Sequence, residues 1–422
     1  MSERDLDVIV FGATGVTGRN VAGYLAERAR DQPLAWAAAG RDAARVQRVL
    51  SEIGVSAPEV IAADVGDPGS LAKMAQRSRV VLNLVGPYTL YGRPVIEACV
   101  DAGTHYADLT GEIPFVRHMI DEFDARAREA GVKVVQVCGF ESLPADLAVM
   151  LAAEAGRERY EEELASVDLE VAIDPLPGLP RASDIISGGT LQSMFALAGE
   201  EDAELAIDPA ALIDDEAAAV SVRHVSPILV APRLGSDGAV IAPMSPAAFI
   251  NPAVIQRTAF LSARSEGRPP QPFRYREGVL MRGGKATLPL RLAGAGALSS
   301  MQAGLRLVTR ASSGRRNRIA GALARVTPGS GFGPVGDRLE GWHWTVSVSA
   351  QTLGAATVTV HVDADDHPGY LATARMLGEA GLLLAEGSTE SEVAGCVTPA
   401  IALGTASAPR FANARVRFSV DP

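Results

Sequence analysis

The sequence predicts an α/β fold: an N-terminal Rossmann-type doubly wound parallel sheet, joined to a second α+β domain with a mixed or antiparallel sheet. Short apolar runs alternate with helix-forming stretches over about the first 140 residues, which is typical of a doubly wound domain. A glycine-rich turn follows the first apolar run. Beyond about residue 150, apolar and polar residues alternate singly, which indicates strands with one solvent-facing side.

Six apolar runs are expected to form the strands of the first domain. Continuous runs of this kind are typical of strands that are buried on both faces of a parallel sheet. The runs cover residues 7–11, 34–39, 60–63, 80–85, 105–109 and 132–138. Helices are expected between them, notably over residues 94–102 and 114–130.

The glycine-rich turn has the sequence GATGVTG, and its place between a strand and a helix predicts a dinucleotide-binding turn. Gly12 would permit the tight turn, Gly15 would let the backbone approach a pyrophosphate, and Gly18 would let the helix pack closely on the strand. Amide groups at the start of the helix would bind the anion. The turn residues expected to contact the cofactor are Gly12, Thr14, Gly15, Val16, Thr17 and Gly18.

The end of the second run favours NADP over NAD. NAD-binding proteins place an acidic residue about 20 residues after the glycines, where it binds the ribose hydroxyls. This chain has Arg41 after Gly40, and a guanidinium group is a good partner for a 2′-phosphate. Asp42 could compete for this role, but we interpret it as the N-cap of a helix over residues 43–50.

The tips of the third and fourth runs complete the expected cofactor site. Asp64 and Val65 would lie beside the adenine, although Asp64 could equally cap the next turn. The contacts expected after the fourth run are Val85, Gly86 and Pro87.

The second half of the chain is expected to hold a substrate or dimerisation domain. Its expected elements are strands over residues 167–173, 344–350, 357–362 and 416–420, and a helix from Pro368 to Gly387. We expect the NADP-binding domain to comprise residues 1–142 together with that helix, and the second domain to comprise residues 143–366 with the last strand. A homodimer is compatible with this division.

Composition and charge narrow the partners and the compartment. The formal net charge of −11 argues against nucleic acid as a partner. Three cysteines are too few for a disulfide framework, so we expect a reducing compartment, the cytoplasm. The charged N-terminal residues predict no signal peptide, and no apolar run reaches the length of a membrane-spanning helix. The six histidines show no metal-ligand spacing, so no metal site is expected.

The catalytic pair of the short-chain dehydrogenases, Tyr-x-x-x-Lys, is missing. None of the three lysines has a tyrosine four residues earlier. These lysines are Lys73, Lys133 and Lys285. That mechanism is therefore excluded, although GATGVTG turns also occur in short-chain dehydrogenases.

Several motifs together resemble those of the saccharopine dehydrogenase-like oxidoreductases, in particular an actinobacterial subgroup described as trans-acting enoyl reductases. The matching segments are GATGVTG, residues 39–41, 83–88, 106–112, 139–147, 187–190, 368–370, 376–379 and 398–400. The resemblance covers nearly the whole chain. It implies an NADP-binding Rossmann domain and the reduction of a carbon–carbon double bond in a polyketide- or lipid-type intermediate that another enzyme supplies. The family usually has Asp where this chain has Glu141, which keeps the acid.

Three side chains near the expected strand ends are candidates for catalysis: Tyr88, Glu141 and Ser142. Ligands of open α/β sheets bind beyond the carboxyl ends of the strands, and enoyl reduction needs a hydride, a proton source and stabilisation of an enolate-like oxygen. Tyr88 or Ser142 could donate a hydrogen bond to that oxygen, and water could supply the proton. Tyr88 could instead wall the nicotinamide pocket, and Glu112 and Glu141 could instead be first-turn helix carboxylates.

Two other functions stay in view. One is a saccharopine-type dehydrogenase that acts on a C–N bond of an amino-acid-derived substrate, for which Arg93 and Arg117 are available as cationic clamps. The other is a scaffold that binds NADPH without turnover, because few catalytic residue types are present.

The segment 278–336 contains nine basic residues and no Asp or Glu, interleaved with leucines. It is expected to be either a solvated face or a surface that docks on an anionic membrane or on the acidic carrier domain that presents an acyl substrate. In the membrane case the protein would be peripheral to the inner face of the membrane.

Overall fold

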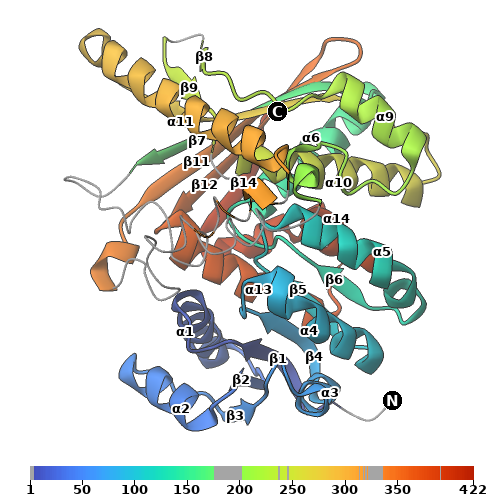
Figure 1. Ribbon diagram of the computed structural model, residues 1–422, viewed down its shortest axis with the longest axis vertical. Coiled ribbons are helices and arrows are strands. Elements are labelled where there is room, and N and C mark those ends of the chain that lie inside the picture. Colours follow the sequence, from blue (N-terminus) through green and yellow to red (C-terminus); the bar gives the residue numbers. More distant parts are fainter. Residues whose placement is uncertain are drawn as a thin grey trace.

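The computed structural model describes residues 4–174, 202–235, 238–244, 247–312, 314–316, 318, 321, 336–389 and 391–422. The motif at residues 187–190 and residues 322–335 of the basic segment lie outside this part of the chain. The described residues form two lobes, each built around a seven-stranded sheet (Figure 1).

The cofactor lobe is built on sheet A, whose strands all pair in parallel. Its order, β13-β6-β5-β4-β1-β2-β3, contains the 3-2-1-4-5-6 order of a Rossmann fold, so the predicted fold class is confirmed. The strands are β1 (Leu6–Phe11), β2 (Trp36–Gly40), β3 (Glu59–Ala62), β4 (Ser78–Asn83), β5 (His105–Asp108), β6 (Lys133–Val135) and β13 (Gly395–Val397). The sequence does not predict β13, which has only three residues and extends the sheet from a distant part of the chain.

Helices cover both faces of sheet A. One face packs against α1 (Val16–Asp31), α2 (Ala43–Glu52) and α13 (Thr373–Glu386). The other face packs against α3 (Pro68–Arg77), α4 (Tyr88–Ala102) and α5 (Ile113–Glu129). Helix α13 approaches its neighbours closely through glycines, because a Cβ at Gly378 would lie 2.5 Å from the Tyr24 ring and one at Gly381 would lie 3.0 Å from Leu82. The C-terminal helix therefore belongs to the core of the cofactor lobe, and it ends at Gly387 as predicted.

The second lobe is built on sheet B, a mixed sheet of order β14-β12-β11-β7-β10-β9-β8. Among the described strands of this sheet, only β10 and β7 pair in parallel. The strands are β7 (Leu164–Asp174), β8 (Arg233–Leu234), β9 (Val240–Ala242), β10 (Arg274–Met281), β11 (His343–Thr352), β12 (Thr357–Asp365) and β14 (Val416–Val420). The predicted hairpin of β11 and β12 is confirmed, whereas β8, β9 and β10 were not predicted.

The remaining helices join the lobes and cover sheet B (Figure 1). They are α6 (Leu143–Tyr160), α9 (Glu216–Val225), α10 (Asn251–Ser265), α11 (Leu288–Thr309), α14 (Pro399–Leu403), a π-helical turn (Pro368–Ala372) and short 3₁₀ turns at Ala203–Ile207, Ala247–Phe249, Lys285–Thr287, Gly336–Leu339 and Thr405–Ala414. Helix α6 packs against β11 and β12, and α10 packs against α6. Within the described ranges, no helix has both the length and the apolar character needed to cross a bilayer.

Candidate functional site

The glycine turn closes tightly around two of its three glycines. Gly12 has φ +94°, and a Cβ there would lie 2.9 Å from the carbonyl carbon of Leu84. A Cβ at Gly18 would lie only 2.3 Å from the carbonyl oxygen of Gly12. A Cβ at Gly15 would meet nothing nearer than that oxygen, at 3.5 Å. Gly12 and Gly18 therefore close the turn, whereas Gly15 leaves free the space that a pyrophosphate needs.

Helix α1 begins at Val16. Its N-cap residue is Gly15, which has no side chain to accept a hydrogen bond from the first amides of the helix. The first amides of the helix are thus free of a competing side-chain acceptor from the cap, which suits an anionic ligand. The other predicted contacts of the turn, Thr14 and Thr17, lie beside this helix start.

The loop after β4 lies next to the glycine turn. The Leu84 N–H donates to the carbonyl of Phe11, at 2.8 Å, and the Val85 side chain lies 3.0 Å from a Cβ placed at Gly12. Strands β1 and β4 are neighbours at the point where the strand order of the sheet reverses, which is where doubly wound sheets bind their ligands. The structure thus places the predicted contact Val85 against the turn, and the predicted contacts Gly86 and Pro87 follow it in the chain.

Arg41 is exposed directly after β2. The neighbouring acid is engaged elsewhere: Asp42 is the N-cap of α2, and its Oδ1 accepts a hydrogen bond from the Arg45 N–H at 2.9 Å. This cap was predicted. It leaves Arg41 as the exposed basic side chain at the end of β2, and its contact with a 2′-phosphate stays a prediction.

Asp64 closes a turn after β3. Its Oδ1 accepts from the Gly66 N–H at 2.8 Å, while Asp67, and not Asp64, is the N-cap of α3. Val65 is half-buried beside it. The contact of Asp64 and Val65 with the adenine stays a prediction.

A buried polar network fills the ends of β4 and β5. Asn83 donates from Nδ2 to the Tyr106 hydroxyl at 3.0 Å, and that hydroxyl donates to Asp108 Oδ2 at 2.8 Å. The other oxygen of Asp108 accepts from the N–H groups of Thr110 at 3.0 Å and of Val137 at 3.3 Å. Burial raises the pKa of Asp108 to about 7. Asp108 thereby fixes the loops after β5 and β6 to each other.

Tyr88 faces the interior. Its hydroxyl donates to the carbonyl of Asn83 at 3.1 Å and accepts weakly from the Leu109 N–H at 3.4 Å. Its own N–H donates to Glu112 Oε1 at 3.1 Å. The geometry matches the alternative in which Tyr88 is a wall residue, because its hydroxyl already donates to Asn83 and is not free to donate to a substrate oxygen. Glu112 precedes α5, but its carboxylate caps a different helix, α4. It accepts hydrogen bonds from the N–H groups of Tyr88 and Thr89, the first two residues of α4.

The loop after β6 is held by a left-handed residue and by two hydrogen bonds to other elements. The expected strand over 132–138 ends early, at Val135, because Val137 has φ +61°, a left-handed conformation that β-branched residues rarely adopt. The Cys138 N–H donates to the Asp108 carbonyl at 2.8 Å. The Phe140 N–H donates to Oγ1 of Thr373, the first residue of α13, at 3.0 Å. Backbone strain of this kind concentrates at functional sites.

Glu141 and Ser142 lie at the end of this loop. The Glu141 carboxylate folds over Gly139, where a Cβ would lie 2.7 Å from Oε2. Burial raises the pKa of Glu141 above its usual range. Ser142 is buried as the N-cap of α6, and its Oγ has no hydrogen-bond partner among the described residues. The two predicted residues therefore offer a carboxyl that holds its proton more tightly than usual and an unused hydroxyl donor.

Asp146 lies one turn into α6, where an acidic residue commonly faces the helix dipole. Its carboxylate instead reaches two distant elements: it accepts from Thr258 Oγ1 in α10 and from the Ala400 N–H in α14, the latter at 2.8 Å. Burial raises the pKa of Asp146 to about 7.

Sequence reasoning missed Glu277 of β10. It is buried, and its Oε2 accepts from the Tyr275 hydroxyl at 2.6 Å and from Asn251 Nδ2 at 2.8 Å. Its Oε1 has no partner in the described part of the chain, and burial raises its pKa to about 7. The lobes meet close to this acid, because Ile250, next to Asn251, contacts Gly111 of the loop after β5. The alternation of Tyr275, Glu277 and Val279 was the sequence signal for an inward-facing acid.

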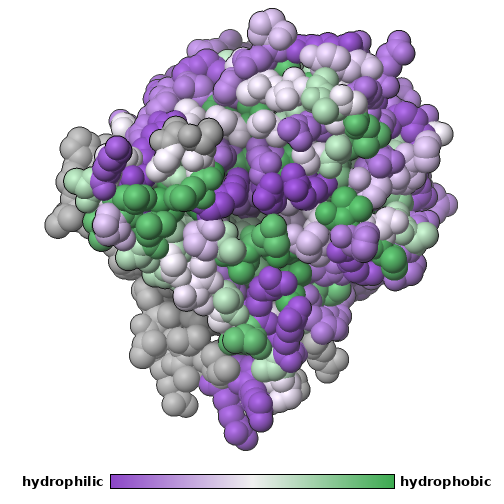
Figure 2. Space-filling view, turned by 90° about the horizontal axis from the view of Figure 1, so that it is seen from above, coloured by the Kyte–Doolittle hydropathy of each residue, from purple (hydrophilic) through white to green (hydrophobic). Residues whose placement is uncertain are grey.

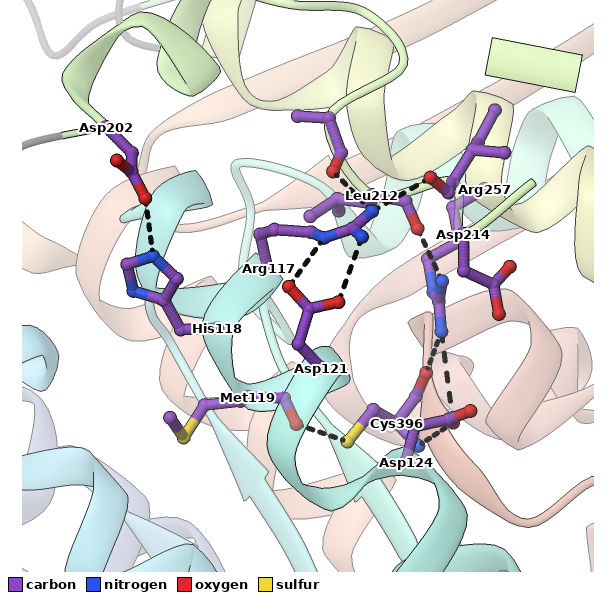
Figure 3. Close-up of polar contacts among 12 residues, drawn as sticks. Arg117, His118, Met119, Asp121, Asp124, Asp202, Leu212, Asp214, Arg257 and Cys396 are labelled. Carbon is purple, nitrogen blue, oxygen red and sulfur yellow. Dashed lines mark hydrogen bonds and ion pairs between the residues drawn. The ribbon is translucent and has the colours of Figure 1, made fainter. Parts of the chain in front are cut away.

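The two arginines considered as clamps for an amino-acid substrate are engaged by protein groups. Arg93 pairs with Glu97 and Glu122. Arg117 pairs with Asp121 at 2.9 Å and donates to the Ile213 carbonyl at 2.8 Å (Figure 3).

Figure 3 also shows Arg257, a buried arginine of α10 that donates to backbone carbonyls of Leu212 and Cys396. Arginines here fasten residues 211–213, α5, α10 and β13 to one another. No group of three or more His, Cys, Asp or Glu side chains within the described ranges could hold a metal ion.

Comparisons with known proteins match both lobes. A family model described as the saccharopine dehydrogenase NADP binding domain matches residues 8–135. A protein of Mycobacterium ulcerans named trans-acting enoyl reductase is 33% identical over 435 residues, which cover 99% of this chain and 98% of the relative. A protein of the same name from Mycobacterium tuberculosis is 32% identical over 441 residues, 98% of this chain and 97% of the relative. The solved structure of apo saccharopine dehydrogenase (L-Glu forming) from Saccharomyces cerevisiae aligns over 99% of this chain and 100% of its own, with 15% identity and a TM-score of 0.50, and so shares the fold.

Proposed function

The chain belongs to the saccharopine dehydrogenase-like family of NADP-binding oxidoreductases, with the mycobacterial proteins named trans-acting enoyl reductases, and on this basis we propose that it is itself an NADPH-dependent enoyl reductase that acts in trans. Its substrate would be a polyketide- or lipid-type intermediate made by another enzyme. The observation that carries the proposal is the match to these relatives from end to end, which includes the second lobe as well as the cofactor lobe.

The residues present fit NADP. The open space at Gly15 and the amides at the start of α1 suit the pyrophosphate. The exposed Arg41 suits the 2′-phosphate. When bound, NADPH supplies the hydride. The chain's own residues then have to orient the double bond, hold the carbonyl oxygen and provide a proton.

We assign the last two tasks to the loop after β6. Adding a hydride to one carbon of a conjugated double bond places negative charge on the carbonyl oxygen, and a proton must reach the neighbouring carbon. The Ser142 hydroxyl is a donor without a competing partner among the described residues. Glu141 is the adjacent acid, and its raised pKa keeps a larger fraction of it protonated near neutral pH. Glu141 is therefore proposed as the proton source and Ser142 as the donor to the oxygen.

The experiment is a reduction assay with enoyl thioesters. The purified protein is mixed with NADPH that carries deuterium at both C4 positions and with 2-enoyl thioesters of increasing chain length, free or attached to a purified acyl carrier domain. We expect NADPH consumption, followed by absorbance, and a saturated product that contains one deuterium by mass spectrometry. The matched control is the saturated thioester, which should leave NADPH unchanged.

Two results would overturn the proposal. If NADPH binds but neither free nor carrier-bound enoyl thioesters are reduced, the protein is a cofactor-binding scaffold or acts on other substrates. If instead the protein oxidises an amino-acid-derived secondary amine with NADP⁺, the C–N dehydrogenase alternative is correct.

A further inference from the structure

Helix α11 is apolar on both sides. Its inner side packs on sheet B, where Ala295 and Leu298 contact Val240 and Ala242 of β9. Its outer side is exposed along the whole helix: Leu290 is 75% exposed, Met301 51% and Leu307 71%. A Cβ added at Gly296 or Gly304 would meet no atom within 4 Å. The helix therefore carries a second apolar face that no described residue covers.

This outer face has no charge of its own. The exposed residues between its ends are Pro289, Leu290, Leu292, Ala293, Ala297, Ser300, Met301, Ala303 and Leu307. The two arginines within the helix turn inward or sideways: Arg291 is buried and donates to the Met281 carbonyl at 3.0 Å, and Arg306 donates to the Ile228 carbonyl at 3.2 Å. From Leu290 to Leu307 the face is about 25 Å long. We call these exposed residues the α11 face.

Cations lie at both ends of the α11 face. Arg282 and Lys285 are exposed just before the helix, and Arg310, Arg315 and Arg318 are exposed just after it. No Asp or Glu occurs from residue 278 to 336, in a chain whose net charge is −11. Figure 2, which looks down on the top of Figure 1, shows hydrophobic surface on the side where α11 lies in Figure 1.

We propose that the α11 face lies on an anionic lipid bilayer, with its leucines inserted into the interface and the terminal cations on the lipid headgroups. An uninterrupted apolar stripe with basic residues at its ends is the pattern of an interfacial helix, and each cation near an anionic surface strengthens binding about fivefold. Charge argues against a second copy of the chain, because two α11 faces packed antiparallel would set Arg282 and Lys285 against Arg310. The proposal does not depend on the reaction, although it would hold the protein where lipid-type intermediates are found.

The test is co-sedimentation with sucrose-loaded vesicles of phosphatidylcholine, with and without phosphatidylglycerol. The wild-type protein should pellet only with the anionic vesicles, and high salt should weaken this binding. Leu290→Ser combined with Leu307→Ser should reduce binding by roughly a hundredfold, because each buried leucine contributes about tenfold. Arg310→Gln with Arg315→Gln should reduce it by about 25-fold and make it less salt-dependent.

The matched control is Leu353→Ser. Leu353 is 59% exposed in the turn between β11 and β12, so its substitution removes an exposed leucine away from α11 and should leave vesicle binding unchanged. NADPH affinity and circular dichroism should be unchanged in all variants, which shows that they are folded.

The proposal fails if the wild-type protein stays in the supernatant with anionic vesicles at low salt. It also fails if Leu353→Ser loses as much binding as the α11 variants. Two further measurements identify another occupant. If the protein binds no vesicles but binds a purified acyl carrier domain, and Leu290→Ser abolishes that binding, the α11 face is a protein-docking surface. If light scattering shows a dimer that Leu290→Ser dissociates, the α11 face is a contact between copies of the chain.

Discussion

Gly15, the N-cap of α1, and Gly18, in its first turn, should respond differently to an added side chain. Gly15 has φ −71° and ψ 165°, a conformation open to any residue, and a Cβ there would meet nothing nearer than 3.5 Å. A Cβ at Gly18 would instead lie 2.3 Å from a backbone oxygen, a distance that forces the turn to move. We therefore expect Gly15→Val to keep the fold and lose the cofactor, and Gly18→Ala to destabilise the fold itself.

The magnitudes follow from these contacts. A branched side chain at Gly15 would occupy the space of the pyrophosphate and separate it from the amides at the start of α1. Losing two hydrogen bonds to a charged group costs about 3–6 kcal/mol, which is roughly a hundredfold to ten-thousandfold in Kd for NADPH. The stability cost should stay near 1 kcal/mol, the scale of a poorer N-cap. For Gly18→Ala the overpacked turn should cost about 1–3 kcal/mol of unfolding free energy.

Calorimetric titration with NADPH and thermal unfolding of the same samples measure both effects. Gly15→Val should show no measurable heat of binding and a nearly wild-type Tm, whereas Gly18→Ala should show a lowered Tm. A folded Gly15→Val protein that binds NADPH as tightly as the wild type would refute the reasoning, because the space before α1 would then not be the pyrophosphate site.

Three further predictions concern substitutions of Arg41, Glu141 and Glu277. Arg41→Ala should weaken NADPH binding by about 1.5–3 kcal/mol and NADH binding little. The control is Arg48→Ala, which removes an exposed arginine of α2 and should change neither affinity. Equal losses of affinity for both cofactors would contradict the 2′-phosphate assignment. Glu141→Gln should lower kcat with little change in NADPH affinity and should remove the high-pH loss of activity if this acid supplies the proton; an unchanged pH profile would exclude it. The pKa of Glu277 is raised to about 7, so the folded state binds its proton more tightly than the unfolded chain does, and its contribution to stability is full below about pH 4 and lost as pH rises through 7. Glu277→Gln should therefore raise the free energy of unfolding near pH 8 and not near pH 5, as measured by urea unfolding. A variant that is equally destabilised at both pH values would show that burial of this carboxyl does not set the pH dependence of stability.

Features that depend on neighbouring residues could be predicted from the sequence. The strand before the glycine turn, the cap at Asp42 and the hairpin of β11 and β12 each follow from a local pattern of apolar residues, turn residues or a capping residue. The same locality explains the errors at strand ends. The expected strand over 132–138 has the right composition, but it ends at Val135 because Val137 has φ +61° and its N–H donates to the Asp108 side chain.

Features that depend on distant residues could not be predicted. Strand β13 has three residues and is stable only because it pairs with β6, more than 250 residues earlier in the chain. Asp146 looks like any acid in the first turn of a helix, where it suits the helix dipole. Its actual partners, Thr258 and Ala400, come from two other elements and decide its burial and its pKa.

The same distinction separates the geometry of the glycine turn, which could be predicted from the sequence, from that of the loop after β6, which could not. The cofactor site rests on a turn whose glycines act on one another, with Gly18 closing onto Gly12 six residues before it. The loop with Glu141 and Ser142 is held from outside, by Asp108 of β5 on one side and Thr373 of α13 on the other. Tyr88 lies near the strand ends by sequence position, but its hydroxyl donates to the carbonyl of Asn83. Which hydroxyl or carboxyl remains free for chemistry is therefore decided by long-range contacts, and on that criterion Ser142 and Glu141 are favoured over Tyr88.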